Sequence, residues 1–242
     1  MKTKAKIKTV ILVGGKGMRL REFTEEMPKA MVPIGGKPIL WHIMKIYATA
    51  GFTDFVLCTG YHREQIEEYF RKNNEDNWNI EFVDTGLEST KAERLRRIEK
   101  FMEGENEFFV AYGDDVSDVD VKAVLEFHRK SGKVGTLTTV NPESQFGVLD
   151  LGESGAVKGI REKPRLNTWI NGGFFVFNRR IFDYLHKVQG ELENEVFAEL
   201  VNEQELVARK HEGFWGCMNT FKEWSELNEL WKHGKAPWKK WE

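Results

Sequence analysis

The strongest constraint on the fold of this chain is a regular alternation of apolar runs of strand length with segments of helical pattern. The strand-like runs include KTVILVGG, DFVLCTGY, WNIEFVD and NEFFVAYGDD, and the helical segments between and after them include PILWHIMKIYATAG, REQIEEYFRKN, TKAERLRRIEKFM and DVKAVLEFHRKSG. Strands that alternate with helices pair in parallel through right-handed βαβ crossovers. We therefore expect an α/β fold with a Rossmann-like, mostly parallel sheet flanked by helices.

The second half of the chain is richer in strands. The runs GTLTTV, FGVLDL, VKGIREK and NGGFFVFN predict a small antiparallel extension, followed by a helix at VFAELVNEQ and a strand at LVARKHEG. From Thr220 onward we expect a final helix and an ordered tail, in which the tryptophans serve packing. No low-complexity linker or internal repeat interrupts the sequence, so we expect one domain over residues 1–242.

The charge balance limits the classes of partner. Lys and Arg number 36 against 38 Asp and Glu, a formal net charge of -2, which argues against a general nucleic-acid or membrane-surface binder. No run approaches the roughly 18 apolar residues of a membrane span. Cys58 and Cys217 are far apart and lack metal-site spacing, so we expect no disulfide framework and a cytoplasmic location.

Three polar stretches follow predicted strands, where open parallel sheets bind their ligands. They are the glycine loop GGKGMR at 14–19, the acidic GDD at 113–115 and the NGG at 171–173. The loop glycines let backbone N–H groups approach phosphate, and Arg19 and Lys29 would add positive charge. Taken alone, the loop is equally consistent with an ordinary strand-to-helix turn, because it matches neither the P-loop spacing nor the dinucleotide fingerprint.

Several charged residues have two interpretations. Asp114 is placed to hold Mg²⁺, whereas Asp118 and Asp120 are more typical of helix caps. Glu162 and Lys163, in REKP, suit a sugar hydroxyl and a phosphate, or form an exposed charged turn. Asn171 together with Gly172 suits recognition of a hydroxyl group or forms a plain turn. His42 lies on an apolar helix, so we expect it in the core or at an interface.

The order of these motifs resembles the sugar-1-phosphate nucleotidyltransferases. The stretches G-G-x-G-x-R, P-K-x-M, IGGKPILWHIM, the G-D after a strand, EKP and NGGFF carry the resemblance, which spans nearly the whole chain. The stretches VDTG, GFW and GKAPWKKWE are most similar to the enzymes that act on CTP and glucose 1-phosphate.

The resemblance implies a role for each matching residue. Arg19, Lys29 and Asp114 would be catalytic, with Asp114 and, although it has no carboxylate, Asn219 holding Mg²⁺. The sugar 1-phosphate would be held by Gly147, Glu162, Lys163, Asn171 and Gly172. The nucleotide would be bound by Leu12, Val13, Gly14, Gly15, Lys16, Gly17, Met18, Arg19, Lys29, Ser89, Arg94 and Gly113.

The reaction implied is the joining of an NTP, with CTP leading, to a sugar 1-phosphate, with glucose 1-phosphate leading. It gives an NDP-sugar for polysaccharide biosynthesis plus pyrophosphate, by Mg²⁺-assisted in-line attack on the α-phosphate. The resemblance also implies a homo-oligomer. Two alternatives stay open: the same reaction with another NTP or acceptor, and a catalytically silent homologue that senses nucleotide or sugar phosphate.

Three departures from the family pattern motivate these alternatives. Asn219 stands where the family has its second metal carboxylate, and Ala92–Glu93 stands where a glycine pair usually precedes the base-contacting arginine. The stretch between EEYF and EFVDTG is also shorter than is typical. The first departure predicts weaker metal binding, and the second leaves the choice of base open.

Overall fold

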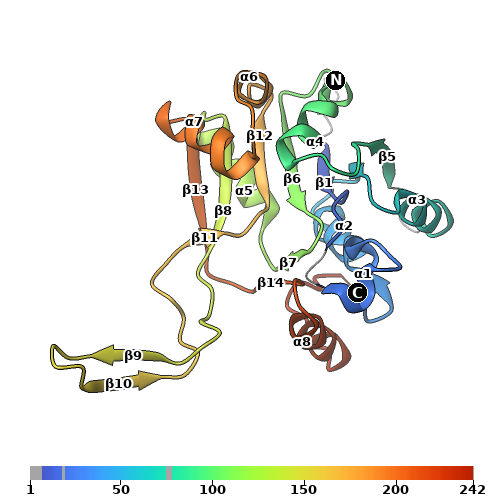
Figure 1. The fold of residues 1–242 in the computed structure, drawn as a ribbon. Coiled ribbons are helices and arrows are strands. Elements are labelled where there is room, and N and C mark those ends of the chain that lie inside the picture. The colour runs from blue at the N-terminus through green and yellow to red at the C-terminus, as the bar shows by residue number, and fades with distance from the viewer. Residues whose placement is uncertain (1–6, 18–19, 75–77, 242) are drawn as a thin grey trace.

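The computed structural model of the protein describes residues 7–17, 20–74 and 78–241, and a mixed eight-stranded sheet forms its centre (Figure 1). Seven strands follow one another across the sheet in the order β11-β8-β12-β6-β1-β4-β5, and β13 pairs with β8. Their bounds are β1 Thr9–Leu12, β4 Asp54–Thr59, β5 Asn79–Asp84, β6 Glu107–Tyr112, β8 Gly135–Val140, β11 Ile170–Asn171, β12 Phe175–Asn178 and β13 Leu206–His211.

The pairing confirms the predicted sheet type. Strand β1 lies between β4 and β6 and is parallel to both, and β4 is parallel to β5. Strand β12 is antiparallel to β6 and β8, and β11 is antiparallel to β8. The antiparallel strands come from the second half of the chain, as predicted, and β13 returns in parallel beside β8.

Helices cover both faces of the sheet because neighbouring strand residues point to opposite sides. Ile11 belongs to one buried apolar cluster together with residues of α2, α3 and α5, whereas Val10 belongs to a second cluster with α4, α6 and α7. The helix bounds are α2 Ile39–Thr49, α3 Arg63–Lys72, α4 Lys91–Arg97, α5 Val121–Ser131, α6 Ile181–Lys187 and α7 Phe197–Asn202.

The structure corrects some predicted boundaries. The helix expected over 90–102 ends at Arg97 and continues as a separate 3₁₀ turn, Glu99–Met102. The helix expected near 196–204 is α7 preceded by one π-helical turn, Leu192–Val196. Helix α6 was not predicted, nor was the small antiparallel sheet of β7 (Asp115–Ser117) and β14 (Trp215–Cys217).

The C-terminal segment packs against α2. Helix α8 spans Phe221–Lys232, and beyond it Trp238 is fully buried beside His42 of α2. Trp238 Nε1 donates to His42 Nδ1 at 3.4 Å, and His42 Nε2 lies 2.9 Å from the carbonyl oxygen of Ile34. The prediction that His42 lies in the core is therefore confirmed.

One hairpin projects from the body of the molecule (Figure 1). It consists of β9 (Val148–Leu151) and β10 (Val157–Arg161), which pair with each other in their own two-stranded sheet. Its apolar side chains are exposed, Ile160 by 69% and Leu151 by 63%. The predicted antiparallel extension thus has two parts: strands within the main sheet and this separate hairpin.

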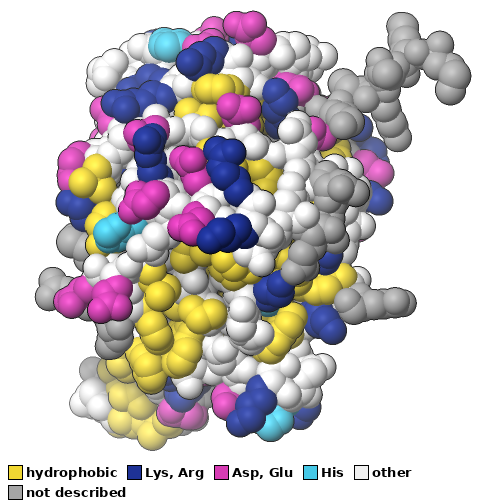
Figure 2. Space-filling view, turned by 90° about the vertical axis from the view of Figure 1, so that its right-hand side faces the viewer, with side chains coloured by type: hydrophobic (Ala, Val, Ile, Leu, Met, Phe, Trp, Pro, Cys, Tyr) yellow, Lys and Arg dark blue, Asp and Glu magenta, His cyan; other side chains and the backbone are white. Residues whose placement is uncertain are grey.

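The face of the molecule drawn in Figure 2 carries side chains of both charges. In Figure 2, acidic and basic side chains intersperse over the upper part of the face and apolar ones gather in its lower part. Among the described residues, every helix is too short or too polar to span a lipid bilayer.

Candidate active site

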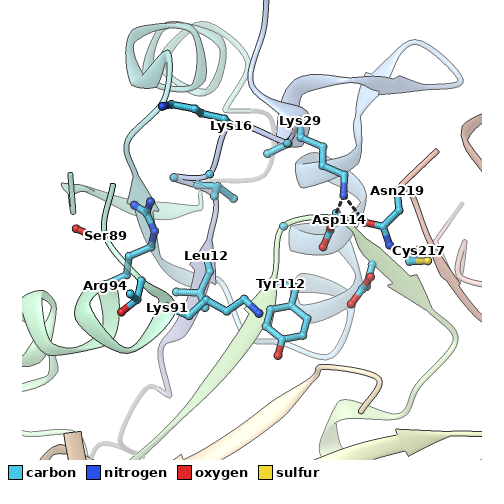
Figure 3. Close-up of a pocket in the computed structure, with 18 of the residues that line it drawn as sticks. Leu12, Lys16, Lys29, Ser89, Lys91, Arg94, Tyr112, Asp114, Cys217 and Asn219 are labelled. Carbon is cyan, nitrogen blue, oxygen red and sulfur yellow. Dashed lines mark hydrogen bonds and ion pairs between the residues drawn. The ribbon is translucent and has the colours of Figure 1, made fainter. Parts of the chain in front are cut away.

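A cavity of about 640 Å³ opens at the carboxyl ends of β1 and β6. The glycine loop, the first turn of α4, the end of β6 and the stretch after β14 surround it (Figure 3). The predicted residues that line it are Leu12, Val13, Gly14, Gly15, Lys16, Gly17, Lys29, Ser89, Arg94, Gly113, Asp114, Asn171 and Asn219. Residues far apart in the sequence therefore meet at one place, as the sheet type required.

The glycine loop is pinned to the neighbouring strand. Val13 N donates to the carbonyl oxygen of Cys58 at 3.1 Å, and Tyr61 N donates to that of Gly14 at 3.1 Å. Gly17 adopts φ +64, and a Cβ there would come within 2.7 Å of Lys29 Cβ. A glycine is needed at 17 both for the backbone and for the lysine stem. Met18 and Arg19, also predicted for this loop, lie outside the described residues.

The side chain of Arg94 packs against the glycine loop at Gly14. Its guanidinium is buried and donates to Thr85 Oγ1 at 2.7 Å and to the carbonyl oxygens of Gly86 at 2.8 Å and Leu87 at 3.2 Å. A Cβ on Gly14 would lie 1.9 Å from Arg94 Nη1. Arg94 thus braces the glycine loop against the 85–87 turn in addition to lining the cavity.

The Ala92–Glu93 departure has a local explanation. Thr90 and Glu93 form a capping box: Glu93 N donates to Thr90 Oγ1 at 3.1 Å, and Thr90 N donates to Glu93 Oε2 at 2.8 Å. Ala92 is fully buried in the apolar cluster under α4. Both residues therefore start and anchor α4, and Ser89, just before the cap, donates its hydroxyl to Thr85 O.

Gly113 and Asp114 directly follow strand β6 and lie beside the glycine loop. A Cβ on Gly113 would lie 2.7 Å from Val13 Cγ1 and 2.9 Å from Leu12 O, so only glycine allows this approach. Asp114 forms an ion pair with Lys29 Nζ, which also donates to Asn219 Oδ1 at 2.8 Å. Figure 3 shows Asp114 and Asn219 converging on that ammonium.

Asp115 also lines the cavity, and its environment differs from that of Asp114. It lies in β7 and is only 6% exposed. Burial, with the neighbouring Asp114 charge, raises the pKa of the Asp115 carboxyl well above its ordinary range. Asp120 caps α5, as expected, by accepting from Ala123 N at 3.0 Å, and Asp118 instead pairs with His211 at 2.9 Å.

A polar network that the sequence did not predict forms another wall. Glu193, in the π-helical turn, pairs with Lys91 Nζ and accepts from Tyr112 Oη at 2.5 Å. Asn171 Nδ2 donates to Tyr112 Oη at 3.1 Å, and Asn171 Oδ1 accepts from Gly173 N at 3.0 Å. These bonds orient the predicted Asn171. Tyr112 directly precedes Gly113–Asp114, and this adjacency is the sequence signal that could have placed Tyr112 at the cavity.

Four predicted sugar-phosphate residues lie outside the described lining of the cavity. Gly147 faces Glu162, whose Oε2 is 3.1 Å from a Cβ built at 147, and both flank the projecting hairpin. Lys163 adopts φ 45, a left-handed conformation uncommon for lysine. Gly172 lies nearer the cavity, since its carbonyl accepts from Trp215 Nε1 at 3.0 Å. Of this predicted group, only Asn171 lines the cavity.

Comparison with known proteins assigns the family. The chain matches the family described as Nucleotidyl transferase over residues 8–231. The chain belongs to this family. It is 41% identical to the glucose-1-phosphate cytidylyltransferase of Salmonella typhi, over 98% of this chain and 100% of that protein.

Two further comparisons extend the match. The mannose-1-phosphate guanyltransferase 2 of Candida glabrata is 35% identical over 86% of this nucleotidyltransferase but only 60% of its own length. The crystal structure of HddC from Yersinia pseudotuberculosis superposes with a TM-score of 0.72 and 23% identity, covering 93% of this chain and 99% of that one. The latter shows a shared fold.

Proposed function

We propose that the protein transfers the cytidylyl group of CTP to glucose 1-phosphate, giving CDP-glucose and pyrophosphate. The observation that carries the proposal is the 41% identity over 98% of the chain to a glucose-1-phosphate cytidylyltransferase, a match that spans all of that protein. The guanyltransferase match covers only part of its relative and therefore supports another base and sugar less well.

The chemistry requires positioning and neutralisation of charge. An oxygen of the sugar phosphate attacks the α-phosphorus in line, a new P–O bond forms, and the bond to the bridging oxygen of pyrophosphate breaks. Backbone N–H groups of residues 12–17 would hold the triphosphate, with Lys16, Arg19 and Lys29 supplying positive charge. Ser89, Arg94 and Gly113 would border the nucleotide.

The side chains of Asp114, just after β6, and Asn219, just after β14, fit a divalent cation. Asp114 and Asn219 already direct oxygens at a single cation, the Lys29 ammonium. Among the described side chains, no three His, Cys, Asp or Glu form a metal-binding group of their own. One carboxylate and one amide oxygen suit Mg²⁺, which takes few protein ligands and completes its shell with phosphate and water. When bound, Mg²⁺ would neutralise charge on the phosphates.

The sugar phosphate would bind on the opposite wall of the cavity. Asn171 is oriented by Tyr112 and Gly173, and its second Nδ2–H, which has no partner among the described residues, would donate to a sugar hydroxyl. We further propose that Gly147, Glu162, Lys163 and Gly172 join this subsite when the substrate is bound.

Three broader expectations complete the proposal: a single domain over 1–242, assembly into a homo-oligomer, and a cytoplasmic location. The last is supported by the two free cysteines, Cys58 and Cys217, which suit a compartment where thiols stay reduced.

Pyrophosphate release tests the function directly. The purified protein is incubated with glucose 1-phosphate, Mg²⁺ and, in separate reactions, CTP, UTP, dTTP, GTP or ATP. Strong preference for CTP is the expected result. Release with a different nucleotide alone would refute the assignment of CTP, and absence of release with all five would refute the reaction with glucose 1-phosphate.

A further inference from the structure

The ammonium of Lys29 occupies the place where the metal of the proposed function would bind. Its Nζ pairs with Asp114 Oδ2 and donates to Asn219 Oδ1 at 2.8 Å, the two oxygens that fit a divalent cation. We propose that Lys29 is a built-in cation that fills this position while nucleotide is absent, so that a divalent ion enters only after the phosphates have drawn Lys29 away. This inference rests on the proposed function of the site.

The charges at this position favour the lysine over a free dication. Asn219 is uncharged, so among the described residues Asp114 is the one anionic group that pairs with the ammonium, and Lys29 neutralises it. The Lys29 side chain is only 12% exposed and that of Asp114 26%, so solvent screens the pair weakly. A metal ion entering alone would have to displace an ion-paired ammonium or bind beside a like charge.

The nucleotide has a direct means of moving Lys29. The lysine stem lies against Gly17 of the glycine loop, where a Cβ would come within 2.7 Å of Lys29 Cβ. Phosphates held by that loop would therefore lie beside the same side chain. A lysine carries its charge on a flexible four-carbon stem, so Nζ can leave Asp114 for a phosphate by rotamer change alone.

A second lysine of the loop provides a matched control. Lys16 pairs with Glu88 at 2.6 Å, and these side chains are 43% and 77% exposed. Lys16 and Lys29 both line the cavity, but in the described structure only Lys29 is paired with Asp114. Removing either lysine removes one positive charge, and removing Lys29 alone frees the two oxygens.

The test is a titration with Mn²⁺ in the absence of nucleotide. The electron paramagnetic resonance signal of the unbound ion measures how much Mn²⁺ has bound. We expect Lys29→Met to bind Mn²⁺ about tenfold more tightly than the wild type or more, since a charge-assisted bond no longer competes. Lys16→Met should stay within about twofold of the wild type. Adding Asp114→Asn to Lys29→Met should abolish the gain.

Two results would overturn the inference: wild-type protein that binds Mn²⁺ as tightly as Lys29→Met, or a gain that survives Asp114→Asn. If Lys29→Met does not fold, judged by its thermal melt, Lys29→Ala takes its place, and Lys29→Arg, which keeps the cation, should bind as weakly as the wild type. The titration uses no substrate, so failure of the pyrophosphate assay would refute the proposed function and leave this result interpretable.

Discussion

Replacement of Gly14 by alanine tests how firmly Arg94 braces the glycine loop. The new Cβ would lie 1.9 Å from Arg94 Nη1 and 2.5 Å from its Cζ, far inside contact distance. The end of an arginine can usually move away, but here the guanidinium donates to Thr85 Oγ1 and to the carbonyls of Gly86 and Leu87. Relief of the clash therefore requires the loss of charged hydrogen bonds in a buried place.

The expected cost follows from these contacts. Overpacking typically costs about 1–3 kcal/mol, and a lost hydrogen bond to a charged group about 1.5–3 kcal/mol. We expect Gly14→Ala to lower the free energy of unfolding by about 2–4 kcal/mol, which for a chain of this size lowers the melting temperature by about 4–16 °C. Urea titration followed by circular dichroism measures the first quantity and a thermal melt the second.

The adjacent glycine supplies the control. A Cβ on Gly15 meets nothing within 4 Å, so Gly15→Ala should stay within about 1 kcal/mol of the wild type. In an Arg94→Met background, the added cost of Gly14→Ala should fall below about 1 kcal/mol, because the clashing group is gone. Equal stability of the two alanine variants would show that Arg94 yields freely, and the bracing argument would be wrong.

The remaining predictions concern the metal position and the buried histidine. Asp114→Asn should lower kcat about 100-fold or more in the pyrophosphate assay, with Asp118→Asn as a control; near-normal turnover would remove Asp114 from the reaction. Asn219→Asp should preserve or raise activity at low Mg²⁺, and an unchanged Mg²⁺ dependence would place Asn219 off the metal. Burial lowers the pKa of His42 from 6.5 to about 4, so the folded protein binds fewer protons than the unfolded chain between these values. The free energy of unfolding should therefore fall by about 2 kcal/mol between pH 7 and pH 5. The urea midpoint of His42→Gln should depend less steeply on pH than that of the wild type. Equal pH dependence of the two proteins would refute the assignment.

Some residues of the site had a signal in the sequence that placed them there, and others had none. The glycine loop and Asp114 could be placed together because each ends a strand, and parallel strands bring their carboxyl ends to one edge. The capping box of Thr90 and Glu93 is a local pattern, T-x-x-E, that explains a departure first assigned to base choice. The pair of Lys91 and Glu193 had no such signal, because the two residues are 102 positions apart.

The order of apolar and polar residues along the chain was enough to specify a mostly parallel sheet with helices on both faces, since strand and helix periods are local properties of sequence. It also indicated which loops lie at the carboxyl edge of the sheet. The partners of Lys29, Arg94 and Tyr112 were decided only in three dimensions. The sequence gives the charge and shape of each side chain. Which distant atoms that side chain contacts depends on how the sheet and helices pack. The cluster of Lys29, Asp114 and Asn219 could therefore not be predicted from the sequence.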